Sequence, residues 1–325
     1  MKKIFTLLLL SSFTTIAFAQ DDAAALSISG TVDAYYQTNL SSPDDLGDSF
    51  GTSFANETGF ALGMANLVAS YETGSTGVVA DVVFGPRGDA AVGGYNLNQL
   101  YAYWNVNETT TLTMGRWNTY LGYEVISPAG NFNYSTSYMF SSGPFSMVGL
   151  KADFSLSDDF SLMLAVMNPT DVNNNTSGGY SLGAQLGYKG QYLNLYFDDD
   201  EVLGFEVDYT GGFDLSEEFF LGINAAYQVS DDAGFYGAAL YPQYTVSDSF
   251  ALGLRGELFG LHAEDLDDLP SVFSTTLTGS YTVDNLTIKP EIRMDAWSEL
   301  EPYLDNDGLL TDSLSVFTLA MVYSF

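Results

Sequence analysis

Residues 284–297, DNLTIKPEIRMDAW, alternate between two kinds of side chain. The even positions from Leu286 to Ala296 are apolar, whereas the odd positions from Lys289 to Asp295 read Lys, Glu, Arg and Asp. Successive side chains of a strand point to opposite faces, so this pattern predicts a β-strand with one apolar and one ionic face. The same period recurs at 147–154, 202–209 and 250–259. The repetition predicts an all-β fold.

Polar turns separate these segments, and their lengths follow a rhythm. Short turns fall near 72–77, 107–109, 156–159, 189–190, 214–218, 246–249 and 283–285. The other connections, mostly longer, cover 41–57, 86–95, 120–144, 168–178, 198–201, 230–233, 261–270 and 297–312. These connections imply about 16 strands, with 14 or 18 as alternatives. Short periplasmic turns at one rim and longer extracellular loops at the other are typical of a transmembrane antiparallel β-barrel.

A soluble β-sandwich or β-helix is the alternative fold, because it also hides one face of each strand. Two features favour the barrel. Only Pro242 and Pro290 fall within expected strands, and aromatic residues gather at strand ends, as membrane interfaces require. The aromatic residues concerned are Tyr71, Trp104, Trp117, Tyr188, Tyr209, Tyr281 and Trp297.

Composition excludes several classes of function. The 325 residues include 9 Lys and Arg against 41 Asp and Glu, a formal net charge of −32. A nucleic-acid partner is excluded, because such binding needs basic side chains that displace counterions. The chain has no Cys, which removes disulfides and thiolate metal sites.

The first residues, MKKIFTLLLLSSFTTIAFAQ, predict an exported protein. Two Lys precede a short apolar run, and Ala17-Phe18-Ala19 is a small-x-small cleavage site. We therefore expect residues 1–19 to be a cleaved signal peptide and 20–325 to form a single barrel domain. The expected location is the bacterial outer membrane.

The block 110–154 resembles a known family. Its Gly-Arg-Trp step at 115–117, Leu-Gly-Tyr-Glu turn at 121–124, Asn-Phe-Asn-Tyr-Ser stretch at 131–135 and Gly-Pro-Phe return at 143–145 are similar to β-barrel porin family 2 (OmpL-like). Elsewhere only the strand rhythm is shared. The last strand ends in Phe325 and resembles the assembly signal of Gram-negative outer-membrane barrels. The resemblance implies an outer-membrane porin.

A barrel in a membrane turns its ionic face inward, since a lipid-facing Arg or Lys at the midplane costs about 2–4 kcal/mol. Arg116 is ambiguous, because it shares strand parity with Leu112 and Met114 and would face lipid without a bulge. The candidate pore-lining residues are Arg116, Lys151, Asp153, Glu206, Asp208, Arg255, Glu257, Lys289, Glu291, Arg293 and Asp295, with Asp33 and Asp81 also on the wall.

The connection 120–144 is the longest and is rich in aromatic residues. Folding into the barrel mouth would bury its apolar surface, and the family resemblance implies the same constriction of the pore. A lid outside the barrel, or one against a neighbouring subunit, is the alternative. The candidate constriction residues are Tyr120, Tyr123, Glu124, Phe132, Tyr134 and Tyr138.

Metal and catalytic signals are weak. Asp171, Asn173 and Asn175 are spaced like the start of an EF-hand loop, but the sixth-position Gly and terminal Glu are missing. No cofactor is expected, although acidic loops could hold Ca²⁺ or Mg²⁺. His262 is the only His, and we place it in a loop beside Glu264 and Asp265, where it lacks a nucleophile motif.

The sequence therefore predicts a porin for passive diffusion of small hydrophilic solutes and ions. Most acids fall in the outer connections, so we expect a weak to moderate cation preference. Expected partners are membrane lipid and lipopolysaccharide, with a homotrimer by analogy. The alternatives are a closed, partner-binding barrel and a barrel hydrolase that uses His262.

Overall fold

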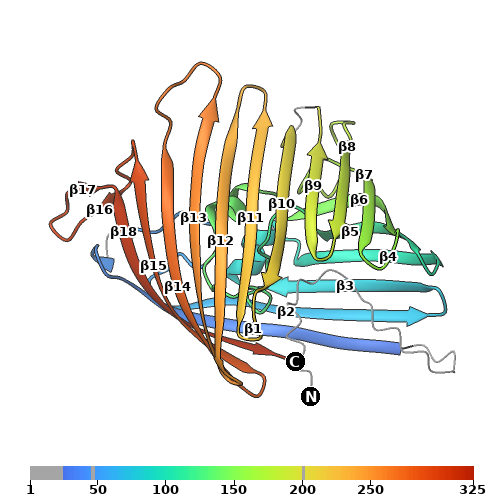
Figure 1. Ribbon diagram of the computed structural model, residues 1–325, viewed down its shortest axis with the longest axis horizontal. Coiled ribbons are helices and arrows are strands. Elements are labelled where there is room, and N and C mark those ends of the chain that lie inside the picture. The colour runs from blue at the N-terminus through green and yellow to red at the C-terminus, as the bar shows by residue number, and fades with distance from the viewer. Residues whose placement is uncertain (1–24, 45–47, 200–201) are drawn as a thin grey trace.

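The computed structural model describes residues 25–44, 48–199 and 202–325, and the predicted signal peptide lies outside them. Sixteen antiparallel strands of this described part close into one barrel, each beside its neighbour in the chain (Figure 1). The predicted fold class and strand number are confirmed, and the alternatives of 14 and 18 strands are wrong. No helix of the described chain is long and apolar enough to cross a membrane.

The barrel strands are β1 (Ala25–Asn39), β2 (Gly59–Thr73), β3 (Thr76–Phe84), β4 (Leu97–Asn107), β5 (Thr110–Asn118), β6 (Ser146–Ser155), β7 (Phe160–Met167), β8 (Ser181–Tyr188), β9 (Gln191–Phe197), β10 (Phe205–Asp214), β11 (Phe219–Ser230), β12 (Ala233–Ser247), β13 (Phe250–Ala263), β14 (Ser271–Val283), β15 (Leu286–Ser298) and β18 (Ser313–Ser324). The connections contain α1 (Pro86–Val92), α2 (Tyr138–Ser142) and the short pair β16 (Tyr303–Leu304) and β17 (Leu310–Thr311).

The barrel closes where its first and last strands meet. β1 pairs with β18 from Thr31 opposite Ser324 to Asn39 opposite Val316. Beyond this ladder, Gly30 and Phe325 exchange two backbone hydrogen bonds of 3.0 Å. Closure satisfies backbone groups that an open sheet edge would leave unpaired, which is the condition for crossing a bilayer with strands.

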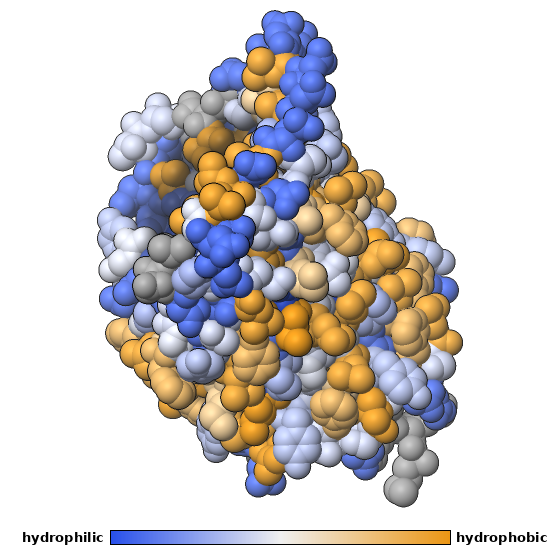
Figure 2. Space-filling view, turned by 90° about the vertical axis from the view of Figure 1, so that its left-hand side faces the viewer, coloured by the Kyte–Doolittle hydropathy of each residue, from blue (hydrophilic) through white to orange (hydrophobic). Residues whose placement is uncertain are grey.

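The alternation seen in residues 284–297 sets the two faces of the barrel. On β15, Arg293 and Asp295 are 1% exposed and point inward, whereas Ile292 and Met294 are 43% and 57% exposed on the outer surface. In Figure 2, hydrophobic side chains spread over the lower part of the surface, and hydrophilic residues gather in the projections above them. An apolar belt below polar loops is the surface expected of a membrane barrel.

Two strand prolines lie where a ladder is interrupted. On β12, pairing with β13 stops after Leu240 and resumes at Gln243, so Pro242 has no partner on that side. On β15, pairing with β14 skips Pro290 in the same way. Since proline has no N–H to donate, these gaps explain how the strands accommodate it.

The connection expected at 230–233 is present as a tight turn, in which Ser230 pairs directly with Ala233. One detail of the expected layout is wrong. Among the expected interfacial aromatics, Trp117 is 5% exposed and packs inside the barrel, and Trp297 is partly buried against an inner cluster. Both rings share the strand parity of inward-facing residues, Trp117 with Thr113 on β5 and Trp297 with Asp295 on β15, so their position near a strand end does not make them interfacial.

Candidate functional site: the lumen and loop 119–145

Strands β13 and β15 carry a column of ionised side chains on the inner wall. Its members are between 0% and 4% exposed, so they are almost completely removed from water. Buried charges are tolerated only when each is paired or hydrogen-bonded. The members of this ionic column are Arg255, Glu257, Lys289, Glu291, Arg293 and Asp295.

Loop 119–145, which connects β5 to β6, supplies the partners of the acids in this column. Glu257 accepts hydrogen bonds from the backbone N–H groups of Tyr138 (3.0 Å) and Met139 (2.8 Å). Glu291 accepts from the backbone N–H groups of Tyr134 (2.7 Å) and Ser135 (3.0 Å). Each carboxylate therefore accepts hydrogen bonds from two consecutive backbone N–H groups of the loop. These hydrogen bonds are charge-assisted, because the acceptor is ionised.

The basic members of the column bind loop carbonyl groups instead. Lys289 Nζ donates to the carbonyl oxygens of Pro128 (2.8 Å) and Asn131. Arg293 donates to the carbonyl of Thr136 at 2.8 Å. The acidic side chains accept from loop N–H groups and the basic side chains donate to loop carbonyl groups. Together these hydrogen bonds fix the loop backbone against one side of the wall.

One ion pair joins the loop and the wall through side chains. Arg255 Nη1 lies 2.7 Å from Glu124 Oε1, and both side chains are at most 3% exposed. Arg255 also donates to the carbonyl of Ser135 at 2.6 Å. Removing one member of such a buried pair leaves an uncompensated charge, so the pair makes the loop position specific.

The loop also reaches the other strands, and α2 within it lies behind β11–β13 in Figure 1. The Tyr134 hydroxyl donates to Asp33 on β1 (2.6 Å), and the Tyr120 hydroxyl donates to Leu195 O on β9 (2.7 Å). The Tyr123 ring stacks on Tyr241 of β12 at 4.3 Å. These contacts carry the loop across the lumen.

The other constriction candidates meet the same strands. The Tyr138 hydroxyl donates to Asp295 at 2.7 Å. The Phe132 ring lies against Gly253 on β13, which has no side chain to obstruct it. The structure thus brings Tyr120, Tyr123, Glu124, Phe132, Tyr134 and Tyr138 together within the barrel. An alternative lid outside the barrel does not agree with these contacts.

Lys151 and Asp153 differ from the column because water reaches them. They form a 3.0 Å ion pair on the inner face of β6, with side chains 24% and 41% exposed. Both lie near the β6–β7 turn, away from the rim from which the loop enters. They are wall charges in the accessible part of the lumen.

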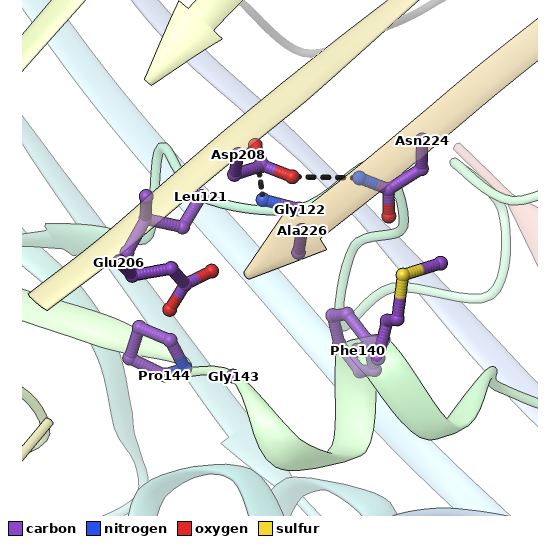
Figure 3. Close-up of a pocket in the computed structure, with 10 residues that line it drawn as sticks. Leu121, Gly122, Phe140, Gly143, Pro144, Glu206, Asp208, Asn224 and Ala226 are labelled. Carbon is purple, nitrogen blue, oxygen red and sulfur yellow. Dashed lines mark hydrogen bonds between the residues drawn. The ribbon is translucent and has the colours of Figure 1, made fainter. Parts of the chain in front are cut away.

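Glu206 and Asp208 stand on β10 and are 2% and 0% exposed. Asp208 accepts hydrogen bonds from Asn194, Asn224 and the backbone N–H of Gly122. The loop therefore contacts this strand as well. Figure 3 shows Glu206 and Asp208 beside a cavity between β10, β11 and the loop.

Arg116 is placed apart from the ionic column. It follows the strand parity of Leu112 and Met114, as expected without a bulge, yet it is only 6% exposed. Its guanidinium donates to Asn98 O (3.0 Å) and to Asn173 in the β7–β8 connection. These contacts with β4 and the β7–β8 connection account for the burial of Arg116, which its strand parity alone does not predict.

The side chains of the three weak metal candidates form hydrogen bonds within the protein. Asp171 accepts from the backbone N–H groups of Phe145 and Ser146, and Asn173 accepts from Arg116. Asn175 bonds the backbone of Gly178 and Gly179. Burial raises the pKa of the Asp171 carboxyl, and its hydrogen bonds from Phe145 and Ser146 oppose that shift. The residues with EF-hand-like spacing therefore stabilise a connection between two strands.

The expected position of His262 is wrong. It belongs to β13 rather than to a loop, and its ring stacks on Tyr227 with centroids 4.8 Å apart. Its Nε2 lies 2.8 Å from Gln228 O. A hydrolase would need a carboxylate or nucleophile at that nitrogen, so this geometry gives the hydrolase hypothesis no support.

Arg87 is a functional candidate that the sequence did not reveal. The β3–β4 connection folds inward as α1, and Arg87 is 3% exposed. It donates to the carbonyls of Ile126 (3.2 Å) and Tyr134 (3.1 Å) and lies 4.8 Å from the ring centroid of Phe54. The sequence around Arg87 gives no signal that it anchors the loop. Its partners are backbone carbonyl groups, which no residue type identifies.

A closed barrel with polar wall residues and an in-folded loop defines the β-barrel porin class. The model of the family described as "Putative beta-barrel porin-2, OmpL-like" matches residues 25–325, and the chain belongs to this family. The resemblance stated from residues 110–154 is thereby confirmed. No curated protein sequence matches the chain.

Solved structures share the fold at low identity. The outer-membrane channel DcaP of Acinetobacter baumannii is 14% identical, with a TM-score of 0.60 over 95% of this chain and 99% of that one. OmpT of Vibrio cholerae is 11% identical, with a TM-score of 0.53 over 94% and 99%. A mutant of Rh. blastica porin is 13% identical, with a TM-score of 0.56 over 93% and 100%.

Proposed function

We propose that this chain is an outer-membrane porin through which ions and small hydrophilic solutes diffuse passively. The observation that carries the proposal is loop 119–145, held inside a closed barrel by the ionic column. A loop that narrows a lumen limits the size of solutes without any moving part or cofactor. Residues 1–19 would direct export and be removed.

The wall charges have two roles in this proposal. The ionic column on β13 and β15 is too deeply buried to meet passing solutes, so it positions the loop. Lys151 and Asp153 are accessible and would meet solutes on the turn side of the loop. In this proposal, therefore, not all of the charged residues predicted to line the pore contact the solute directly.

Single-channel recording tests the proposal. Correctly folded protein should give discrete current steps in planar bilayers, whereas protein unfolded by heat before addition should give none. The complete absence of steps from folded protein would contradict the porin function.

A closed barrel is the second candidate, because inner residues are buried on several sides of the loop. Examples are Tyr134, Met147, Tyr196 and Arg255, each at most 1% exposed. A closed barrel predicts no current from the wild type but current after the loop is deleted. The porin predicts current from both.

The acidic connections suggest the partners of the outer surface. We propose that divalent cations bridge them to lipopolysaccharide phosphates, a role that oxygen-rich clusters can serve. A homotrimer is proposed by analogy with other porins. The mass of the detergent complex in solution would distinguish one copy from three.

A further inference from the structure

Glu206 carries a buried carboxylate oxygen without a hydrogen-bond partner. The residue is 2% exposed, and its Oε2 has no partner within the described part of the chain. Figure 3 shows the carboxylate directed into a cavity between β10, β11 and loop 119–145, beside Leu121 and Pro144. An orphan oxygen in such a place needs an explanation.

A second carboxylate shares the cavity. Asp208 lies two residues further on β10, on the same inward face, and is 0% exposed. Its hydrogen-bond donors are Asn194, Asn224 and the Gly122 backbone, all of which are neutral. None of the ten described residues that line the cavity is basic. The two acids therefore lack a compensating protein charge there.

This arrangement is costly unless something else binds. Moving an ionised carboxylate out of water costs several kcal/mol even after the protein relaxes, and two neighbouring anions repel each other. For Glu124 in the same lumen, Arg255 offsets this cost through a 2.7 Å ion pair. The cavity between β10 and the loop lacks such a side chain but has space for about one ion or water.

We propose that Glu206 and Asp208 bind one Ca²⁺ ion in this cavity. The side-chain donors are oxygens, which select a hard cation, and two carboxylates match a double positive charge. Ca²⁺ tolerates irregular coordination, whereas Mg²⁺ demands near-ideal octahedral geometry. Asn224 also lines the cavity, and its amide N–H donates to Asp208 at 2.6 Å, which holds that carboxylate in place (Figure 3).

The ion would fasten the loop to β10, five strands along the barrel wall from β15. Gly122 of the loop donates to Asp208 at 3.1 Å, and Leu121 lines the cavity. Ca²⁺ on Glu206 and Asp208 would thus join β10 and the start of the loop. The inference does not depend on conduction, since binding alters stability whether or not the lumen is open.

Calorimetric titration of Ca²⁺ into chelator-treated, folded protein tests the site. The wild type should show one strong binding event above weak binding to the outer loops. Glu206→Gln should weaken that event by about tenfold or more, because a charged ligand is lost. Glu217→Gln is the matched control, since it makes the same change on an exposed turn after the same strand. Equal binding by wild type and Glu206→Gln would overturn the proposal.

Thermal unfolding gives a second measurement, the Tm, with an expected pattern that a folding defect would not produce. Without Ca²⁺, Glu206→Gln should melt above the wild type, because it removes an unpaired buried charge. With Ca²⁺, only the wild type and Glu217→Gln should rise in Tm. If the Tm of the wild type does not change with Ca²⁺ at pH 7.5, protonation alone is enough to accommodate Glu206 and Asp208, and the site is refuted.

Discussion

At the residue scale, the main result is the difference between buried and accessible charge on one inner wall. Arg255 and Glu124 are nearly inaccessible, whereas Lys151 and Asp153 are partly in water. Coulomb interactions are stronger away from water, but the penalty for an unpaired charge grows as well. The two pairs therefore predict very different costs of substitution.

Arg255→Gln should destabilise the barrel by about 3–5 kcal/mol, because it strands Glu124 without its partner. Lys151→Gln, the exposed counterpart, should change stability by about 0–1 kcal/mol. Urea unfolding of protein folded in detergent measures both free energies. Equal losses would contradict the anchoring role of Arg255.

On β15 the period of two predicted the face that carries Arg293 and Asp295, and both are buried there. It did not predict that Glu257 and Glu291 accept hydrogen bonds from loop amides, since every residue type except proline has a backbone N–H. Arg87 escaped notice for the same reason, as its partners are carbonyl groups. Trp117 was misplaced because its place near a strand end was weighed above its inward parity, and His262 because β13 extends to Ala263, beyond the expected end of the strand.

At the element scale, β1 and β2 are joined around one buried acid. The register of this pair shifts between Val32 and Ala34, so that Gly63 and Met64 form a bulge on β2 opposite Asp33. Asp33 accepts from the Met64 N–H (2.9 Å) and from the Tyr134 hydroxyl (2.6 Å). The bulge thereby ties β1, β2 and the loop together. A Cβ on Gly63 would overlap the Asp33 carboxylate.

Gly63→Ala should therefore destabilise the protein by about 1–3 kcal/mol, the cost of displacing a buried hydrogen-bonded acid. Gly256→Ala is the control, because a Cβ there meets nothing within 4 Å. It should be neutral or slightly stabilising, since Gly weakens a strand. Unfolding midpoints in urea compare the two. A neutral Gly63→Ala would show that Asp33 is not held in place.

The strand rhythm was predictable at this scale, because turns such as 189–190 and 284–285 have a distinctive polar composition. The β11–β12 turn lies at the predicted position, 230–233, although most connections at that rim are longer. The connection 120–144 was predicted to enter the lumen from its aromatic content. Its individual contacts depend on the closed wall and were not predictable.

At the scale of the whole molecule, a net charge of −32 lies mostly outside the lumen. Clusters such as Glu264, Asp265, Asp267 and Asp268 belong to the outer connections. Such charges attract cations to the mouth, but salt screens them over about 10 Å at 0.1 M and 3 Å at 1 M. The charge thus predicts a salt-dependent preference.

The reversal potential in a tenfold KCl gradient should indicate a weak to moderate cation preference at low salt. The preference should fade when both solutions approach molar concentration, because the outer charges are then screened. Neutralising the 264–268 cluster should reduce it at low salt only. A strong anion preference would contradict this account of the charges.

The central claim is that loop 119–145, anchored inside the barrel, limits conduction. Unitary conductance of the wild type and of a variant lacking residues 122–142, measured in the same bilayer and salt, tests it most directly. The account predicts clearly larger current steps from the variant, because the segment crossing the lumen is gone. An unchanged conductance in a correctly folded variant would contradict it.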